Sequence, residues 1–511
     1  MTDHILCFDL GTTGAKTTLF STTGEIVAST FSRYETVYPQ PGWAEQSAED
    51  WWRAAASSAR ALLADRQVSV AAVGLCGHMM GCLPVDGAGV PLGNSLIHSD
   101  TRSEAQCARL GGELGARGLY EITGNVLDPH YPLSKILWLR EVLPEVYRKT
   151  RYILQSKDYL AFRLTGRLGI TDHSDASLSA CYDLHRRRWS ERIAEALRIG
   201  HLLPEIVPSA TVIGRVSAEA AGATGLPEGT AVVIGGGDGS CATVGAGAVN
   251  VGDAYNYIGG TSWVSAVRRE PLLDGQMRLF NVCDLDPLKV NALGTVQCAG
   301  SSLEWFADQI AVAETRQAQV EGQSRYEIIG RLASQSPPGA RGLVFLPYLM
   351  GERATIWDPL ARGAYFGLSL AHTRADLARA TLEGVGYTLR SILRVVEEQG
   401  EPVAQIRAIG GGAEGAVWTE ILAGIYDRPV AVCESPSEAT SRGAFVAAAI
   451  AIGLIDDWAD AGSLVRVQRR HEPDRAAAEV YRGYWAFAES LYSDFRAAYR
   501  RLAQLTQGET A

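Results

Sequence analysis

Two glycine-rich turns that carry hydroxyl side chains lie half a chain apart in this sequence. The first, Gly11-Thr12-Thr13-Gly14, leads to Lys16, and the second is Gly259-Gly260-Thr261-Ser262. Glycine allows backbone N–H groups to come close to an anion, and threonine or serine adds hydroxyl donors. Each turn separates two short apolar runs, so each is predicted to be a tight hairpin between strands. Two such turns predict a duplicated domain that holds one polyphosphate from both sides.

The first turn differs from the P-loop of nucleotide-binding proteins. A P-loop has four residues between its glycines and a glycine directly before its lysine. Here two residues separate Gly11 from Gly14, and Ala15 precedes Lys16. The residues that follow are typical of a strand rather than a helix. We therefore exclude a P-loop and keep the hairpin interpretation.

Two aspartates follow predicted strands and could take part in phosphoryl transfer. Asp238 lies in a glycine cluster after the buried strand 231–234, at the edge of an α/β sheet where ligands bind. Its carboxylate could accept the proton of an attacking hydroxyl group, and the alternative is a simple N-cap of the next helix. Asp9 opens the first turn and could hold Mg²⁺ through water beside phosphates, or only stabilise its own turn. Asp9 and Asp238 are thus the candidate metal ligands, and Asp238 is the candidate base.

A third glycine-rich turn, 410–415, follows a predicted strand and begins a helix. Its Gly410-Gly411-Gly412-Ala413-Glu414-Gly415 fits the dinucleotide-binding fingerprint, and Glu434 ends the next strand where a ribose-binding acid belongs. However, only one helix-sized unit follows Glu434 before the C-terminal tail, which is too little for a dinucleotide-binding domain. A turn that contacts an adenosine or phosphate at a helix N-terminus is the simpler interpretation. A plain β–α turn and a dinucleotide enzyme remain as alternatives.

Two polar loops of the first half follow apolar strands and are candidate sugar-binding segments. One contains His78-Met79-Met80, after the predicted strand 70–75, and the other contains His98-Ser99-Asp100-Thr101-Arg102. Asp100 and Arg102 offer an acceptor and a forked donor for a polyol, although a surface salt bridge explains this pair equally well. Metal binding by His78 and His98 has no supporting ligand spacing.

Composition favours a large enzyme and argues against several other classes. A chain of 511 residues indicates two or more domains, because single cores stop growing near ~250–300 residues. A net charge of −10 without a marked basic run argues against nucleic-acid binding. Nine scattered cysteines without a C-x-x-C pair indicate buried thiols in a reducing cytoplasm. The longest apolar stretch, 444–455, is shorter than the ~20 residues that span a membrane. The N-terminus begins a strand without a signal peptide, so we expect a cytoplasmic protein.

Strands and helices alternate along both halves, which predicts an α/β fold with parallel sheets. In the first half, helices are expected at 132–142, 156–164 and 189–197, and a helix of small residues from 240. In the second half, strands are expected near 254–268, 279–284, 342–346, 406–409 and 430–432, and helices near 300–312, 324–334, 374–399 and 417–426 and from 441. The tail 475–505 is predicted to form one or two amphipathic helices. We place the domain boundary near residue 245, which gives domains 1–245 and 246–511.

Longer motifs resemble those of the FGGY carbohydrate kinases. The segment 363–368, Gly-Ala-Tyr-Phe-Gly-Leu, with 376–383, Asp-Leu-Ala-Arg-Ala-Thr-Leu-Glu, fits one family signature, and 132–141 fits most of the other. Further matches are Lys157-Asp158-Tyr159-Leu160, Thr171-Asp172 with Ser174-Asp175-Ala176-Ser177, and Gly351-Glu352-Arg353. The resemblance extends from about residue 4 to 455. Within the family, the chain resembles the xylulokinase-like (pentulose kinase) branch.

The resemblance implies two actin-like, ribonuclease-H-like domains with a cleft between them. ATP would bind against the second domain and the sugar against the first. The turns at 9–16 and 260–262 would hold phosphates, Gly411-Gly412-Ala413 would contact the adenosine, and Asp238 would activate a primary hydroxyl group. The implied activity is Mg²⁺-dependent transfer of the γ-phosphate of ATP to a xylulose-like pentulose or a related polyol. A homodimer is a further family expectation, and a catalytically silent, nucleotide-binding regulatory protein on the same fold is the alternative.

The sugar-binding loops depart from the family pattern. Xylulokinases carry Gln-Met-His where this chain has His78-Met79-Met80, and they carry tryptophan and asparagine in place of His98 and Ser99. In the family, asparagine commonly follows the catalytic base, whereas Gly239 follows Asp238 in this chain. Methionine is a poor hydrogen-bonding partner for a hydroxyl group, and one unpaired polar group changes discrimination by on the order of 1–3 kcal/mol. We therefore predict that the best sugar need not be D-xylulose.

Overall fold

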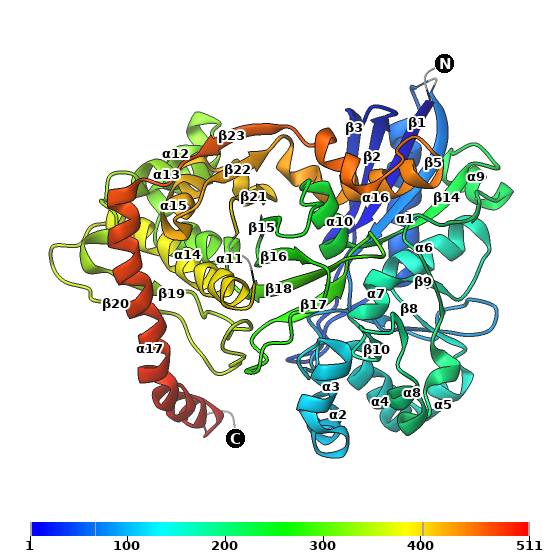
Figure 1. Cartoon of the computed structure of the whole chain (residues 1–511), viewed down its shortest axis with the longest axis horizontal. Helices are drawn as coiled ribbons and strands as arrows, with labels where there is room; N and C mark the ends of the chain where they lie inside the picture. Colours follow the sequence, from blue (N-terminus) through cyan, green and yellow to red (C-terminus); the bar gives the residue numbers. More distant parts are fainter. Residues whose placement is uncertain (1–2, 67, 401–402, 509–511) are drawn as a thin grey trace.

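The computed structural model describes residues 3–66, 68–400 and 403–508, and a sheet from each half of the chain forms its centre (Figure 1). Within these residues, the first sheet has the order β13-β14-β5-β1-β2-β3 and the second has the order β17-β18-β16-β15-β21-β22-β23. The inner strands of both sheets are short, largely buried apolar runs, whereas edge strands such as the first sheet's Ile26–Arg33 are partly exposed. The predicted α/β class is therefore confirmed.

The first sheet combines an antiparallel meander with two parallel strands. Its meander strands are β1 (Asp3–Leu10), β2 (Gly14–Ser21) and β3 (Ile26–Arg33). Strand β5 (Ser69–Gly77) pairs with β1 in parallel, and β14 (Ala231–Gly237) pairs with β5 in parallel. At the edge, β13 (Val212–Arg215) pairs antiparallel with β14.

The second sheet repeats this arrangement. Its meander strands are β15 (Ala254–Ile258), β16 (Ser262–Arg268) and β18 (Val290–Val296), with β17 (Phe280–Cys283) at the edge. Strands β21 (Ile406–Ile409) and β22 (Val430–Cys433) add in parallel to β15, and β23 (Val467–His471) closes the other edge. The same order of three antiparallel and two parallel strands in both sheets confirms the predicted duplicated, actin-like fold.

Most of the predicted helices form at the expected positions. In the first half the predicted helices that form are α4 (Pro132–Val142), α6 (Ser156–Thr165) and α8 (Glu191–Leu197), while α1 (Ala48–Leu63) was not predicted. In the second half they are α11 (Gly300–Gln309), α13 (Arg325–Ala333), α14 (Arg374–Glu398) and α15 (Ala416–Tyr426), and a further helix, α12 (Val312–Glu321), also forms. Helix α8 begins later than predicted because Trp189 belongs to the short strand β11 (Arg188–Trp189). Strand β18 and helix α12 were not anticipated.

One helix of the second half packs on the first sheet. Helix α16 (Ala439–Ala451) contacts β1, β5 and β14 and lies along α10 (Asp238–Gly245), as Figure 1 shows beside the N-terminal strands. Glycines make this approach possible, since a Cβ atom on Gly245 would lie 1.7 Å from Ala439 O and one on Gly443 would lie 2.0 Å from Cys241 O. The segment that connects β22 to α16 therefore reaches the end of the first sheet.

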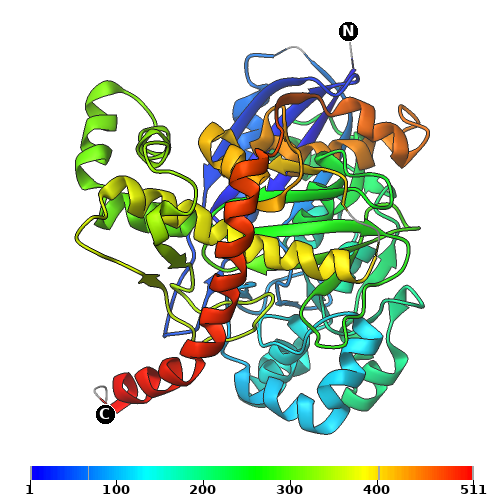
Figure 2. The same cartoon turned by 60° about the vertical axis from the view of Figure 1, so that its left-hand side comes forward.

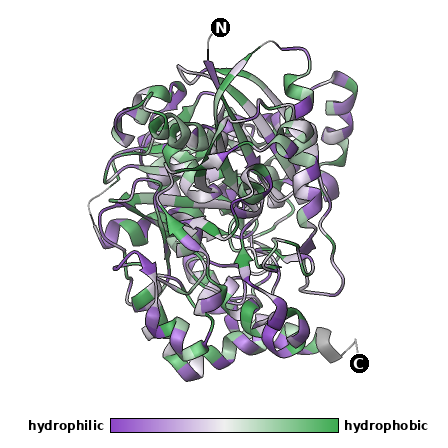
Figure 3. Cartoon of the chain, turned by 90° about the vertical axis from the view of Figure 1, so that its right-hand side faces the viewer, coloured by the Kyte–Doolittle hydropathy of each residue, from purple (hydrophilic) through white to green (hydrophobic). Residues whose placement is uncertain are grey.

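The outer surface is formed by helices with mixed polarity. Figure 3 shows hydrophilic and hydrophobic residues alternating along the peripheral helices, as expected where one face packs on a core. The tail forms one long helix, α17 (Arg475–Gly508), whose last turns extend away from the body (Figure 2). All nine cysteines are buried free thiols, as predicted. In the part of the chain that the structure describes, we find no helix long and apolar enough to cross a membrane.

Candidate active site

The two hydroxyl-bearing glycine turns both form hairpins, as predicted. In the first, Gly11 N–H donates to Gly14 O (3.0 Å), and the Tyr34 hydroxyl donates to Gly11 O. In the second, Gly259 N–H donates to Thr261 O (3.0 Å), and Gly300 N–H donates to Gly259 O (2.8 Å). Since Gly300 begins α11, the second turn lies beside a helix N-terminus, where a phosphate is stabilised.

Asp9 and Asp238 come from two strands that flank β5. Cys76 of β5 is paired with Asp9 on one side and with Gly236 on the other. Asp238 follows β14 as the first residue of α10, and Gly239 N–H donates to its Oδ1 (2.8 Å). Asp9 is buried, and its Oδ2 accepts a 2.5 Å hydrogen bond from Thr440 Oγ1. The fold thus brings both candidate carboxylates to one end of the first sheet.

Burial makes Asp238 a much weaker acid than an ordinary aspartate. Its pKa is raised to about 7, first by desolvation and second by the negative charge of Asp9, while the Gly239 hydrogen bond acts in the opposite direction. A carboxylate with a pKa near neutrality binds a proton well yet is largely ionised in mild alkali. These are the properties required of a general base that works near neutral pH.

Lys16 is held by the segment that precedes α16. Its Nζ donates to Ser437 O (2.6 Å) and lies 3.2 Å from Glu438 Oε1. Glu438 Oε2 also accepts from Thr18 Oγ1 (2.9 Å). The first turn is therefore attached to the second half of the chain through Glu438, a partner that sequence reasoning missed. The role of Lys16 in phosphate binding stays a prediction.

The third glycine turn lies against the second. Gly410 N–H donates to Pro436 O (2.8 Å), and 411–414 form a short 3₁₀ helix before α15. A Cβ atom on Gly412 would lie 2.4 Å from Ile258 Cγ2, at the end of β15 where the second turn begins. A Cβ atom on Gly411 would meet no atom of residues 3–66, 68–400 or 403–508 within 4 Å. The turn therefore borders open space next to the second phosphate turn, and Ala413 itself is buried.

The His78 side chain is buried in a mostly apolar setting. Within the described residues neither ring nitrogen has a partner of hydrogen-bond geometry, and the ring packs edge-on against Trp51 at 5.3 Å and lies 6.3 Å from the His98 ring. Burial, and next the charge of Lys135, lowers the pKa of His78 to about 4. Burial and the neighbouring His78 likewise lower the pKa of His98. Both imidazoles are therefore neutral at pH 7 and can act as either donor or acceptor.

The loop that contains Met79 and Met80 contacts both the residue before the base and α4. A Cβ atom on Gly237 would come within 2.5 Å of Met79 Cγ, so Met79 packs on the residue before Asp238. Lys135 of α4 donates to Met80 O (3.1 Å) and to Ile97 O (2.6 Å), which ties the two polar loops together. Burial lowers the pKa of Lys135 to about 8. Sequence reasoning placed Lys135 in a family signature but gave it no role.

Asp100 lies in an internal ion pair rather than a surface one. Its carboxylate is fully buried, pairs with Arg102 Nη2 at 2.7 Å and accepts from Ala44 N–H at 2.7 Å. The Arg102 guanidinium lies 3.7 Å from the Trp43 ring centroid. The pair therefore already has partners, and direct contact of Asp100 with a sugar stays a prediction.

Arg353 brings an unpaired cation from the second half, which sequence reasoning did not identify. Its Nε and Nη2 are buried and have no hydrogen-bonding partner in the described part of the chain. The guanidinium lies 5.8 Å from the Phe280 ring and 5.7 Å from the Trp357 ring. Its charge is one of the contributions, after burial, His78 and Lys135, to the lowered pKa of His98. The family motif at 351–353 was the available signal.

The donor set at Asp9 and Asp238 fits a magnesium ion that is bound together with phosphates. Among the described residues, no group of three or more His, Cys, Asp or Glu side chains could hold a metal by itself. Mg²⁺ commonly binds through one or two carboxylates, several waters and the substrate phosphates. Two carboxylates at one sheet end, with glycine turns nearby, match that pattern.

A duplicated actin-like fold with glycine turns and a carboxylate of raised pKa defines a phosphotransferase of the kinase type. The N-terminal domain of the FGGY family of carbohydrate kinases matches residues 4–245, and the C-terminal domain of that family matches residues 254–452. The chain therefore belongs to the FGGY carbohydrate kinases, which use ATP, and the predicted family is confirmed.

Similar proteins have xylulose or gluconate in their names. The chain is 30% identical to a xylulose kinase of Staphylococcus epidermidis over 510 residues, covering 98% of this chain and 97% of that protein. It is also 30% identical to a gluconokinase of Bacillus subtilis over 514 residues, covering 99% of each. The crystal structure of a ligand-bound xylulose kinase from Lactobacillus acidophilus superposes with a TM-score of 0.91 at 25% identity, covering 98% of this chain and 100% of that chain.

Proposed function

We propose that this carbohydrate kinase transfers the γ-phosphate of ATP to a primary hydroxyl group of a xylulose-like pentulose or a related polyol. The observation that carries the proposal is the Asp238 carboxylate, whose pKa is about 7, beside Asp9 at the end of the first sheet. The domains 1–245 and 246–511, the cytoplasmic location and the homodimer remain predictions that accompany this proposal.

In the proposed reaction, some residues of this chain bind ATP and Mg²⁺, and another activates the sugar hydroxyl group. The turns at Gly11–Lys16 and Gly260–Thr261 offer amide and hydroxyl donors to phosphates, and Gly411–Ala413 borders the space proposed for adenosine. The predicted donor Ser262 is instead fully buried, and its hydroxyl donates to Tyr257 O. Asp9, with Asp238, would provide carboxylate oxygens for Mg²⁺, and ATP bound with that ion would supply the phosphoryl group. The ionised Asp238 Oδ accepts the proton of the sugar hydroxyl, which raises the nucleophilicity of that oxygen. Closure of the two halves would exclude water.

The sugar loops support a substrate other than D-xylulose. Two neutral imidazoles, His78 and His98, lie in the loops proposed to bind the sugar, and neither His78 nitrogen is paired within the part of the chain that the structure describes. Met80 adds no strong hydrogen-bonding group at the position of the family histidine. Two neutral imidazoles can each donate or accept a hydrogen bond, so together they can bind neighbouring hydroxyl groups of a sugar. The geometry of that binding would differ from the geometry of the Gln-Met-His loop of xylulokinases.

A second candidate substrate is an aldonate such as gluconate, which the gluconokinase relative favours and whose carboxylate Arg353 could pair with, although Arg353 belongs to a motif shared with the ketose kinases. An unpaired, partly desolvated guanidinium is a strong partner for a carboxylate, with which it forms paired charge-assisted hydrogen bonds. The gluconokinase relative supports this candidate independently. Replacement Arg353→Gln would raise KM for an aldonate by at least tenfold and would change KM for a neutral ketose much less, because only the aldonate carries a full negative charge.

The experiment that tests the proposal is a coupled ADP-release assay with Mg·ATP. The panel contains ketopentoses, ketohexoses, tetruloses, polyols and aldonates, with D-xylulose as reference. We expect ADP release that depends on one of these compounds. Activity with an aldonate alone would favour the second candidate. ATP hydrolysis that no compound stimulates would instead favour the silent regulatory alternative, which the three kinases compared above do not support.

A further inference from the structure

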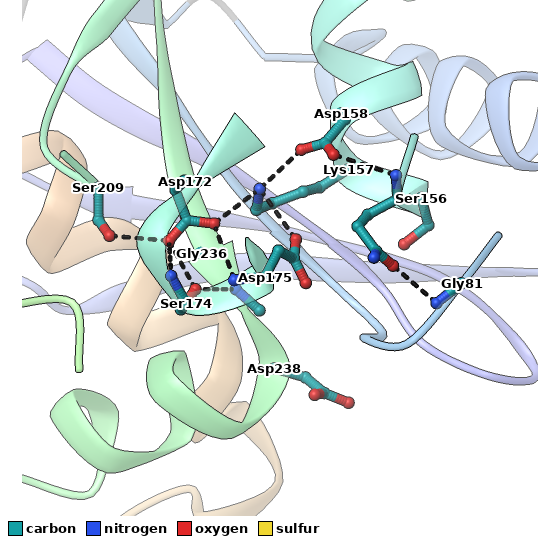
Figure 4. Close-up of polar contacts among 12 residues, drawn as sticks. Gly81, Ser156, Lys157, Asp158, Asp172, Ser174, Asp175, Ser209, Gly236 and Asp238 are labelled. Carbon is teal, nitrogen blue, oxygen red and sulfur yellow. Dashed lines mark hydrogen bonds and ion pairs between the residues drawn. The ribbon is translucent and has the colours of Figure 1, made fainter. Parts of the chain in front are cut away.

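A buried ion cluster lies next to β14, the strand that ends just before Asp238. Lys157 Nζ is 2.9 Å from a carboxylate oxygen of each of Asp158, Asp172 and Asp175. These side chains are almost completely excluded from solvent, and Figure 4 shows the lysine amine among the three carboxylates, with Asp238 nearby. One ammonium group facing three carboxyl groups requires further hydrogen-bond donors, because unpaired buried charge is strongly unfavourable.

Ser174 supplies such a donor to Asp172. Asp172 Oδ2 accepts from Ser174 Oγ (2.6 Å), Ser174 N–H (2.8 Å) and Ser209 Oγ (3.0 Å). A serine hydroxyl has one proton, which here points at a carboxylate, so its lone pairs face the other way. On that side Ser174 Oγ accepts the N–H of Gly237 (2.8 Å). The charge of Asp172 therefore sets the direction of the hydroxyl, and the hydroxyl holds the amide.

Gly237 is the backbone residue from which the base extends. It is the last residue of β14 and the N-cap of α10, and as a glycine it brings no side chain of its own to cap that helix. The pairing of β14 with β5 is irregular between Val233 and Gly236, and Gly235 has φ +60°. The backbone turn before Asp238 thus leaves the regular pairing of the sheet. The Ser174 hydroxyl is a side-chain contact that holds this turn in place. The fit is close, since a Cβ atom on Gly236 would lie 2.8 Å from Ser174 Oγ.

We propose that Ser174 is a positioning residue for phosphoryl transfer: its hydroxyl fixes the Gly237 amide and thereby the direction in which the Asp238 carboxylate faces the sugar. The proposal rests on the proposed function, because it concerns the same base. Ser174 acts through the backbone and does not touch the substrate. A displacement of about 1 Å at a reacting group can cost on the order of 10²-fold in rate, so a loosened turn has a measurable effect.

The test compares two variants of Ser174 with a matched control. Ser174→Ala removes the acceptor, and Ser174→Cys keeps a slightly larger side chain of the same shape but offers only a weak acceptor. Ser209→Ala is the control, since it removes a donor to the same Asp172 oxygen and leaves the Ser174–Gly237 hydrogen bond in place. We expect both Ser174 variants to lower kcat for sugar phosphorylation by about 10- to 100-fold with KM for sugar and Mg·ATP little changed. We expect Ser209→Ala to keep kcat close to that of wild type.

Hydrogen–deuterium exchange of the peptide that covers residues 231–240 gives a readout independent of activity. Exchange should be faster in the Ser174 variants than in Ser209→Ala. Wild-type-like kcat or unchanged exchange in the Ser174 variants would overturn the proposal, as would an equal loss of kcat in Ser209→Ala. Should Ser174→Ala fail to fold, Ser174→Cys decides by the same criteria. A wild-type protein that phosphorylates no sugar would refute the proposed function, whereas the exchange data would still show whether Ser174 holds Gly237.

Discussion

Asp9 and Asp238 lie on opposite sides of strand β5, and the charge of Asp9 contributes to the raised pKa of Asp238. Their strands are far apart in the chain but adjacent to β5 in the sheet. Thr440 of the second half donates to Asp9 and so holds it in place. The acidity of the proposed base is thus set by burial and by a carboxylate from the other side of one strand.

This relationship predicts the pH dependence of catalysis. Since only the ionised Asp238 can accept a proton, kcat/KM should fall about tenfold per pH unit below an apparent pKa near 7 and level off above it. Asp9→Asn removes a negative charge that raises the pKa of Asp238, so the descending limb should move to lower pH, even though the variant is slower. Steady-state kinetics from pH 5 to 9 at fixed free Mg²⁺ measures the wild-type profile and its shift in Asp9→Asn. A profile that stays flat between pH 5 and 8 would contradict the assignment.

The sugar loop offers a prediction about specificity. The double variant His78→Gln/Met80→His restores the family's Gln-Met-His sequence and with it a polar partner for a sugar hydroxyl. We expect kcat/KM for D-xylulose to rise by about tenfold, the equivalent of one regained hydrogen bond, and KM for Mg·ATP to stay unchanged. Kinetics on D-xylulose and on the preferred substrate of the wild type, side by side, measure the change. An equal loss on both sugars would instead show that the loop is needed only for packing.

The proposed adenosine space can be probed with a single methyl group. Gly411→Ala adds a Cβ atom where the structure has no atom within 4 Å, so the folded state should be unaffected while the added methyl group meets the nucleotide. We expect KM for ATP to rise severalfold without a change in Tm. Gly93→Ala, also with no atom within 4 Å of the added Cβ atom, is the matched control. An unchanged KM for ATP in Gly411→Ala would place the adenosine elsewhere.

Local sequence patterns were enough to predict the elements that carry the site. The hairpins around Gly11 and Gly260 follow from glycine between apolar runs, and the position of Asp238 follows from a buried strand that ends in glycines. Helix α4 was predicted with its observed bounds. These features depend on residues that are neighbours in the chain.

Contacts between distant segments could not be predicted in the same way. The apolar run of α16 indicates a buried helix, but it does not indicate that the helix packs on the first sheet. The Lys16–Glu438 pair and the Ser174–Gly237 hydrogen bond likewise join segments far apart in the chain. Strand β18 was missed because its small residues, such as Ala292 and Gly294, give a weak strand signal.

The most direct test of the account is Asp238→Asn, assayed by sugar-dependent ADP release with the best substrate of the wild type. Asparagine keeps the shape of the side chain but cannot accept the proton, so kcat should fall by about 10²- to 10⁴-fold, while ATP binding measured by calorimetry is retained.

The folded state of the wild type binds a proton at Asp238 more tightly than the unfolded state does, so its stability falls as pH rises toward 7. Asp238→Asn should therefore have a Tm at pH 8 no lower than that of wild type, which serves as the folding control. A folded Asp238→Asn variant with near-normal kcat would contradict the assignment of Asp238 as the base.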